Sequence, residues 1–384
     1  MNIKQLTKAF KERFTGDYAV FSAPGRINII GEHTDYNNGF VLPGAINKTI
    51  DLVIHINKDS NIINAVANDL NEEESFTKDT IETKYHWTKY ILGVVGELTK
   101  LGCNIPGFDC VFGGNVPVGS GMSSSAALES VVGLALNDLL GLNLSRFQLA
   151  KVGQMSEHNY VGVRCGIMDQ FASLFGDEGK LVKLDCRSLE YEMIPFNPIG
   201  YSIVLLDTKV SHSLASSEYN KRRASCEEGV SIIAAKYKEV KSLRDVSIDM
   251  LEEFIDDMSI ETYKRCLYVV GEIDRLQKAC KALKVNDFKT VGKLMFETHD
   301  GLQVLYEVSC DELDFLVQFA KEFDGAIGSR VMGGGFGGCT ISFVETDKEH
   351  DFIEQSSKRF KEKFGYDPVV HEVEIANGAK QIMN

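Results

Sequence analysis

A glycine- and serine-rich segment at residues 119–127 joins an apolar strand to an amphipathic helix. It reads GSGMSSSAA, follows a predicted strand at 108–112, and precedes Leu128, Val132 and Leu139 at helical spacing. The glycines let the backbone turn tightly and let a ligand approach the main chain. The serines suit the N-cap of the helix, whose unpaired N–H groups and partial positive charge favour an anion such as phosphate. A capped helix after a glycine turn is the simpler alternative, so the segment alone leaves both interpretations open.

The spacing within this segment excludes two common nucleotide-binding motifs. It lacks the Gly-Lys-Ser/Thr ending of a Walker A loop. It also has Ser124 where a Rossmann fingerprint needs its third glycine, which disfavours an NAD-dependent oxidoreductase. The hydroxyls of Ser123, Ser124 and Ser125 can each ligate a metal ion or donate to phosphate.

The composition indicates a globular chain without a nucleic-acid surface. The chain has 384 residues, 44% of them hydrophobic, and a formal net charge of −14, which disfavours nucleic-acid binding. Nine cysteines without a CxxC pattern favour reduced thiols over a disulfide framework or a zinc site. No apolar run is long enough to cross a bilayer, and lysines interrupt the apolar residues before Phe14, unlike a signal peptide. We therefore expect a cytoplasmic protein with no membrane partner and no nucleic-acid partner.

Strands and helices are interspersed along the chain, with long helices dominating after residue 210. Mixed connections between them predict an α+β fold and not a doubly wound sheet. Pro195, Pro198 and Gly200 mark the best boundary, so we expect one domain at 1–200 and a second at 201–384. The expected strands are 17–23, 48–56, 61–66, 108–112, 181–184, 201–206, 326–331, 339–344 and 368–373, and 69–74 is expected to be a solvated turn. The expected helices are 6–14, 87–101, 128–139, 145–161, 216–237, 260–283, 287–298, 312–323 and 349–364.

A loop at residues 25–39 carries an unusual density of polar groups. It reads GRINIIGEHTDYNNG and places Arg26, Glu32, His33 and Asp35 within ten positions. Loops often carry binding groups, and such short polar side chains suit a polyol, whose hydroxyls both donate and accept hydrogen bonds. A solvated hairpin loop is the simpler alternative. His33 and Asp35 without a third ligand are weak grounds for a metal site.

Two carboxylates and a late glycine cluster complete the candidate chemistry. Glu157 lies late in a helix that opens with a capping box at 145–148, and Asp169 follows a glycine break. Two carboxylates near a phosphate loop can hold Mg²⁺ and deprotonate a hydroxyl, although most acidic pairs in a chain with 55 acidic residues lie on the surface. Residues 333–338 read GGGFGG between two apolar strands, which indicates either backbone pressed against another part of the chain or a flexible hairpin.

These features, in this order, resemble the GHMP family of small-molecule kinases, and within it the galactokinases. Residues 25–43, GRINIIGEHTDYNNGFVLP, are similar to the galactokinase signature. Residues 116–127, VPVGSGMSSSAA, resemble the family's phosphate-binding motif, with Met122 in place of the usual leucine, a change that conserves volume. Further segments at 166–170, 216–223 and 331–338 also match, so the resemblance spans almost the whole chain.

The resemblance implies a two-domain α+β fold, ribosomal-protein-S5-like at the N-terminus and ferredoxin-like at the C-terminus, with the active site in the cleft between the domains. It implies ATP-dependent phosphorylation of the C1 hydroxyl of D-galactose, the first committed step of galactose use, with Mg²⁺ as cofactor. Phosphoryl transfer asks mainly for positioning and charge stabilisation.

The resemblance also assigns roles to residues by their positions. Asp169 would take the proton of the C1 hydroxyl, and Arg26 would keep that carboxylate ionised and stabilise charge during transfer. The sugar hydroxyls would be held by Glu32, His33, Thr34, Asp35 and Tyr219. The ATP phosphates would be held by Gly119, Ser120, Gly121, Met122, Ser123, Ser124 and Ser125. The metal would be held by Ser125 and Glu157.

Alternatives within and outside this activity stay open. One alternative is a kinase of N-acetylgalactosamine or L-arabinose on the same scaffold. The choice among these sugars depends on the space beside the C2 hydroxyl, which sequence alone does not show. A galactose and ATP sensor without catalysis is disfavoured by Asp169, because a pure sensor has no need of a base. We expect a monomer.

Overall fold

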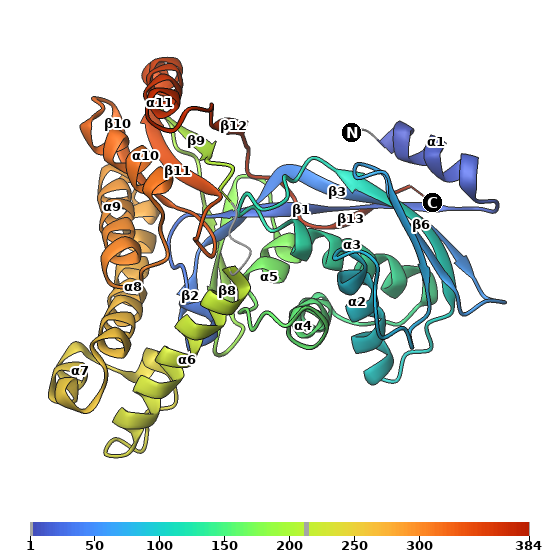
Figure 1. The fold of residues 1–384 in the computed structure, drawn as a ribbon, viewed down its shortest axis with the longest axis horizontal. Coiled ribbons are helices and arrows are strands. Elements are labelled where there is room, and N and C mark those ends of the chain that lie inside the picture. Colours follow the sequence, from blue (N-terminus) through green and yellow to red (C-terminus); the bar gives the residue numbers. More distant parts are fainter. Residues whose placement is uncertain (1–2, 211–214, 384) are drawn as a thin grey trace.

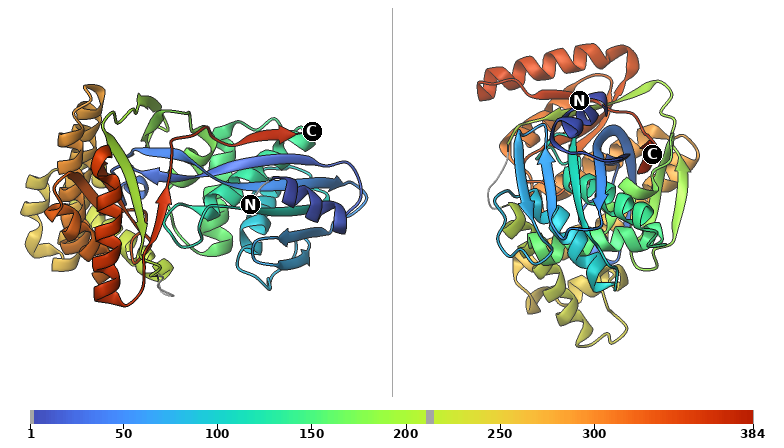
Figure 2. Two further views of the ribbon diagram at one scale, coloured as in Figure 1. Left: turned by 90° about the horizontal axis from the view of Figure 1, so that it is seen from above. Right: turned by 90° about the vertical axis from the view of Figure 1, so that its right-hand side faces the viewer.

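The computed structural model describes residues 3–210 and 215–383, which form two units at opposite ends of the long axis (Figures 1 and 2). The first unit contains a six-stranded sheet in the order β13-β1-β3-β6-β4-β5. Only β4 and β6 are parallel in this order, and α2 lies in the connection that a parallel pair requires. The strands are β1 Ala19–Asn28, β3 Pro43–Asn57, β4 Ile63–Ala67, β5 Glu72–Phe76, β6 Gly107–Gly114 and β13 Lys380–Met383.

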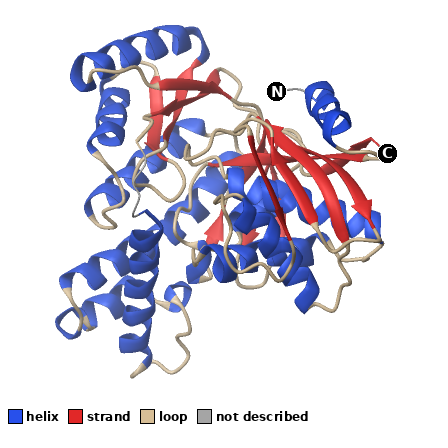
Figure 3. Ribbon diagram, turned by 45° about the vertical axis from the view of Figure 1, so that its right-hand side comes forward, coloured by secondary structure: helices blue, strands red, loops and turns tan. Residues whose placement is uncertain are grey.

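Side chains that alternate along these strands give the sheet two buried faces. A row of Val20, Val53, Val111 and Val66 crosses four strands in register and packs under α1. The opposite face packs against the other helices of the first unit in the largest core cluster (Figures 1 and 3). The helices are α1 Ile3–Arg13, α2 Thr88–Lys100, α3 Ser124–Leu140, α4 Arg146–Ser156 and α5 Met168–Phe175.

The chain passes to the second unit after a small sheet of β2, β7 and β8. The second unit has an antiparallel sheet in the order β10-β11-β9-β12, with helices packed on it. The strands are β2 Phe40–Val41, β7 Lys180–Asp185, β8 Tyr191–Pro195, β9 Tyr201–Asp207, β10 Ala326–Val331, β11 Cys339–Glu345 and β12 Val369–Glu372. The helices are α6 Ala215–Ala234, α7 Ile248–Glu253, α8 Ile260–Lys284, α9 Phe288–Val304, α10 Asp311–Glu322 and α11 Glu349–Phe364.

The chain changes sheets between β8 and β9, where the boundary near residue 200 was expected, but its last strand returns to the first unit. The Ala376 N–H donates to the Ala45 carbonyl at 2.8 Å, and β13 then pairs with β1. The second unit therefore does not hold all of residues 201–384. The mixed α+β architecture is as predicted. Every helix of the described residues is too short or too polar to cross a membrane.

The structure differs from the prediction most clearly at residues 69–74, where a solvated turn was expected. Glu72–Phe76 forms the edge strand β5. Its acidic side chains have specific partners, because Glu72 accepts from the Trp87 indole N–H at 2.7 Å and Glu74 accepts from the Lys84 N–H at 2.7 Å. These contacts fix the approach to α2. The expected capping box at Ser145 and Gln148 is present in both directions.

Candidate active site

The loop at residues 119–125 lies against the glycine cluster of the second unit. A Cβ on Gly121, where φ is +80°, would lie 2.8 Å from the Met332 carbonyl oxygen, and Gly333 packs on Gly121 in turn. The Cys339 N–H donates to the Ser120 carbonyl at 3.1 Å. The late glycines are therefore backbone pressed against this loop, as the first of the two interpretations predicted.

The start of α3 is not capped by a serine side chain, which corrects one expectation. Ser123 occupies the N-cap position with a left-handed φ of +60°, and its side chain makes no capping hydrogen bond. Its hydroxyl donates instead to Oδ2 of Asp169. The first N–H groups of α3 thus have no cap from Ser123, and they keep the capacity to bind an anion.

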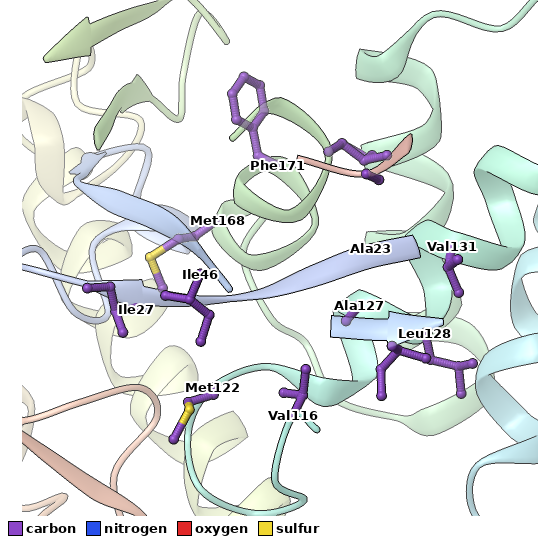
Figure 4. Packing of buried hydrophobic residues seen from close by; sticks show 14 of the residues in the cluster. Ala23, Ile27, Ile46, Val116, Met122, Ala127, Leu128, Val131, Met168 and Phe171 are labelled. Atoms are coloured by element: carbon purple, nitrogen blue, oxygen red, sulfur yellow. The ribbon is translucent and has the colours of Figure 1, made fainter. Parts of the chain in front are cut away.

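Met122 and Ser120 anchor the loop rather than present side chains to a ligand. The Met122 side chain is fully buried in the core cluster that includes Val116 and Ile27 (Figure 4), and its carbonyl accepts from the Arg26 N–H at 3.1 Å. The Ser120 hydroxyl is also buried and donates to the Pro117 carbonyl at 2.9 Å. Of the residues predicted to hold ATP, these two can contribute only backbone groups in this arrangement.

Arg26 and Asp169 form a two-pronged ion pair at the loop. Arg26 Nε donates to Asp169 Oδ1 at 2.8 Å, and Nη2 donates to Oδ2 at 2.9 Å, a bidentate geometry that fixes the carboxylate. Arg26 also donates to the Gly121 carbonyl. Burial lowers the pKa of Arg26, but the carboxylates of Asp169, Glu32 and Asp35 raise it by more, so the guanidinium stays charged. Asp169 lies in the first turn of α5, and its side chain is 32% exposed.

Glu157 and Ser125, the predicted metal ligands, are brought together by a π-helical segment, Glu157–Val161, which follows α4 directly. The Glu157 side chain is buried and accepts a hydrogen bond from the Ser125 hydroxyl. The pKa of Glu157 is raised to about 7, mainly by burial; the Ser125 hydrogen bond acts in the opposite direction, and the negative charge of Asp169 adds to the rise. A buried carboxylate and a hydroxyl beside a second carboxylate are oxygen ligands of the kind that Mg²⁺ prefers.

Glu129 is a further buried carboxylate that sequence reasoning missed. Its Oε2 accepts from Gln170 Nε2 at 3.0 Å, whereas Oε1 is buried without a hydrogen-bond partner among the described residues. Burial, followed by the charge of Glu157, raises its pKa well above the ordinary value. Three acids crowded in this way favour a nearby cation, so the residues fit Mg²⁺. The place of Glu129 as an acidic residue inside the apolar run of α3 could have marked it as a site residue.

Glu32 is held by groups from the second unit. Its Oε1 lies 3.0 Å from Arg330 Nη1 and accepts from the Gly333 N–H at 2.8 Å. Arg330 is fully buried and also donates to the carbonyls of Ile29 and Asn28. Sequence reasoning missed Arg330, although an arginine in the apolar strand before the glycine cluster was a usable signal.

His33 lies in a cluster of aromatic rings. Its φ is +63°, its Nδ1 is 2.8 Å from the Tyr36 hydroxyl, and its Nε2 is buried with no partner in the described chain. Burial is the main cause that lowers the pKa of His33 to about 3; the Gly334 backbone acts in the opposite direction, and the charges of Arg222 and Arg330 add to the lowering, so the ring is neutral. The Tyr219 ring lies 5.2 Å from the His33 ring, and a Cβ on Gly334 would lie 3.4 Å from its Cδ2 atom.

Asp35 lies between this cluster and Asp169. It begins the 3₁₀ turn Asp35–Asn37, and its Oδ1 accepts from the Tyr36 N–H at 3.0 Å. Its carboxylate fills the space that a Cβ on Gly166 would need, 1.8 Å from Oδ2, which explains the glycine. Burial, then the charge of Asp169, raises the pKa of Asp35 to about 7.

Thr34 does not fit its predicted contact with substrate. Its side chain is completely buried, and its hydroxyl donates within the loop to the carbonyls of Gly31, at 2.9 Å, and Phe40. Thr34 therefore holds the shape of the loop that carries its neighbours. The other predicted polar side chains converge on one region between the two units.

Family models match three stretches of the chain. The galactokinase galactose-binding signature matches residues 8–55. The N-terminal domain of GHMP kinases matches residues 89–177, and the C-terminal domain of GHMP kinases matches residues 277–362.

Full-length relatives agree with these models. A galactokinase of Clostridium acetobutylicum is 42% identical over 386 residues, covering 99% of each chain, and one of Thermotoga maritima is 41% identical over 360 residues, covering 94% of this chain and 99% of its own. A crystal structure of Lactococcus lactis galactokinase complexed with galactose matches with a TM-score of 0.94 and 33% identity, over 99% of this chain and all of that one. A mevalonate kinase structure, at 20% identity and a TM-score of 0.65, shares the fold.

Proposed function

This chain belongs to the galactokinases of the GHMP kinase family, and on that basis we propose that it transfers a phosphoryl group from ATP to the C1 hydroxyl of D-galactose. The observation that carries the proposal is the position of Asp169. Its carboxylate is held by Arg26 and Ser123 beside a loop whose helix start is open to phosphate. A base and an anion site next to one another are what transfer to a hydroxyl requires.

Asp169 takes the proton of the sugar hydroxyl in this proposal. A carboxylate has about four lone-pair positions, and the bonds from Arg26 and Ser123 occupy three of them. One position is left for the C1 hydroxyl. We propose that the proton moves late, as the bond to phosphorus forms.

The backbone of residues 119–125 and the first turn of α3 hold the ATP phosphates. The net charge of −14 makes local groups necessary, since the protein as a whole repels a polyphosphate. The helix start and the Arg26 guanidinium supply positive charge at this place. The second unit keeps the loop in shape through its contacts with Gly121 and Ser120.

Ser125 and Glu157 hold Mg²⁺ in this proposal. When bound, the ion supplies positive charge that neutralises the phosphate oxygens. Burial and the negative charge of Glu157 raise the pKa of Glu129, and burial and the negative charge of Asp169 raise the pKa of Glu157. Ionisation of one acid therefore disfavours ionisation of its neighbour until a cation is present. Glu129 and Glu157 thus favour binding of a divalent ion at this position.

Glu32, His33, Asp35 and Tyr219 hold the sugar hydroxyls. Arg330 and Gly333 occupy Oε1 of Glu32, and the neutral His33 has an unpartnered Nε2. These fixed groups suit a polyol, and the aromatic ring of Tyr219 offers an apolar surface.

We also propose a cytoplasmic monomer with a domain boundary near residue 200 and the last strand joined to the first domain. All nine cysteines are unpaired, which suits a reducing compartment.

One assay tests the activity and the sugar together. Purified protein with Mg-ATP is given galactose, N-acetylgalactosamine, L-arabinose or glucose, and ADP release is measured. We expect turnover with galactose. Turnover only with N-acetylgalactosamine or only with arabinose would make that sugar the substrate in place of galactose. No turnover with any sugar would favour a sensor without catalysis.

The Asp169→Asn variant tests the assignment of Asp169 as the base. We expect turnover to fall by about 10²- to 10⁴-fold, the usual contribution of a general base, while ATP binding measured by calorimetry stays nearly unchanged. Near-normal turnover in this variant would remove Asp169 from its role.

A further inference from the structure

Three neighbouring strands of the second unit place a thiol, a carboxylate and an imidazole on one face of the sheet. Cys339 on β11 pairs directly with Asp207 on β9, and His371 on β12 pairs with Leu205, two residues before Asp207. Because side chains alternate along a strand, Leu205 and Asp207 point to the same side, and directly paired residues share a face. Register alone therefore brings the three groups together.

The ligand atoms of these residues have the spacing of a metal site. One atom from each of Asp207, Cys339 and His371 lies within 4.8 Å of the others. His371 Nε2 is 3.5 Å from Asp207 Oδ2. Two ligands on one tetrahedral zinc ion, each about 2.1 Å from the metal, are about 3.4 Å apart. The observed separation matches that value better than it matches a hydrogen bond of about 2.9 Å.

Burial and missing partners point to the same conclusion. Cys339 is fully buried, and the side chains of Asp207 and His371 are 13% and 11% exposed, which leaves an entry path for an ion. His371 Nε2 is buried without a hydrogen-bond partner among residues 3–210 and 215–383. The other oxygen of Asp207 accepts from the Lys209 N–H at 2.8 Å, the kind of outer contact that orients a metal ligand.

We propose that Asp207, Cys339 and His371 bind a divalent transition metal ion, with Zn²⁺ as the preferred class. Thiolate and imidazole ligands suit Zn²⁺ and disfavour Mg²⁺, so this site is distinct from the oxygen site at Glu157. On binding, the Cys339 thiol releases its proton to solvent as the metal–sulfur bond forms. Water takes the fourth position. No CxxC pattern marks this site, because its three ligands come from separate strands.

The site lies directly behind the phosphate loop. The Cys339 N–H donates to the Ser120 carbonyl, and the Thr208 N–H, next to Asp207, donates to the Gly338 carbonyl at 3.0 Å. A bound ion ties β9, β11 and β12 together at this point. We therefore expect the ion to raise the temperature of unfolding, because it binds the folded chain and not the unfolded one.

Cobalt is the probe, because Co²⁺ occupies zinc sites and a cobalt–thiolate bond absorbs in the near ultraviolet. The full-length protein, stripped of metal with a chelator, is titrated with Co²⁺ and then with Zn²⁺. We expect one Co²⁺ per chain with the thiolate band, and displacement of cobalt by Zn²⁺. Absence of a stoichiometric thiolate band in the folded wild type would overturn the proposal.

Matched variants locate the ion. Cys339→Ser is expected to lose the band, and His371→Gln is expected to bind at least about 100-fold more weakly, the upper range for loss of an outer-shell partner. Two control variants should keep the band: Cys103→Ser removes a thiol elsewhere, and His350→Gln changes the exposed cluster of His350, Asp351 and Glu354. Thermal unfolding without metal checks that each variant is folded. If Cys339→Ser does not fold, the His371→Gln variant tests the proposal in its place. A band retained at wild-type affinity in His371→Gln would place the ion elsewhere.

Discussion

Where several carboxylates of the site are buried together, their pKa values differ from the ordinary ones. Asp35 is the clearest case, because burial and the nearby Asp169 raise its pKa from 3.8 to about 7. An unfolded Asp35 titrates near its ordinary value. Between these two pKa values the folded chain therefore binds more protons than the unfolded chain at this position, and stability falls as pH rises.

Asp35→Asn is expected to remove this part of the pH dependence. From pH 4 to 7 the unfolding free energy of the wild type should fall relative to that of the variant, with a slope of up to about 1.4 kcal/mol per pH unit. Denaturant unfolding at several pH values measures the difference. Asp177→Asn, at an aspartate whose side chain is 42% exposed, is the control and should run parallel to the wild type. Parallel curves for Asp35→Asn as well would show that Asp35 is not the group responsible.

At the same scale, sequence predicted which residues lie together better than it predicted the groups that hold them. The resemblance to the GHMP kinases implied that Arg26 lies near Asp169, Ser125 near Glu157 and the polar loop near Tyr219, and the structure has these neighbours. Glu129 and Arg330 were not, because their roles depend on neighbours brought by tertiary packing. Thr34 was assigned to substrate because a polar residue in a binding loop looks the same whether it faces the ligand or the loop itself.

Among the elements, the phosphate loop and α3 show how backbone conformation prepares an anion site. Sequence predicted the strand, the turn and the helix correctly. It did not predict that Ser123 adopts a left-handed conformation and gives its hydroxyl to Asp169 instead of capping the helix. Local propensity favours the cap, and the tertiary contact with Asp169 overrides it.

Gly119 and Gly121 offer a matched pair for testing this element. Both have left-handed φ, +78° and +80°, but an added Cβ meets nothing within 4 Å at Gly119 and lies 2.8 Å from the Met332 carbonyl oxygen at Gly121. Gly119→Ala should cost about 1–2 kcal/mol of conformational strain. Gly121→Ala should add displacement of the loop and raise the KM for ATP by about 10- to 100-fold.

Steady-state kinetics at saturating sugar, together with thermal unfolding, separates strain from displacement. Gly119→Ala is expected to change unfolding with a smaller effect on the KM for ATP. Equal effects of the two substitutions on that KM would mean that contact with the second unit does not shape the loop.

For the whole molecule, the decisive contacts join parts of the chain that sequence reasoning treats as separate. The strands and helices of both units were largely predicted, but β13 and its return to β1 were not, since a short exposed strand at the end of a chain carries little pattern of its own. Arg330 likewise connects β10 of the second unit to Glu32 and to the carbonyls of Asn28 and Ile29 in the first.

Arg330→Met tests how much this connection stabilises the molecule. Removing the guanidinium leaves Glu32, 2% exposed, as an uncompensated buried charge, which should lower the unfolding free energy by about 3–5 kcal/mol. The double variant Glu32→Gln/Arg330→Met should recover part of the loss, because it removes that charge. Lys284→Met is the matched control, since its ion pair with Glu192 also joins the two units but is 49% exposed on both sides, so its loss should cost at most about 1 kcal/mol. Denaturant unfolding of the four proteins measures all three differences. If Arg330→Met costs no more than Lys284→Met, then packing of the two units, and not this buried pair, holds Glu32 in the site.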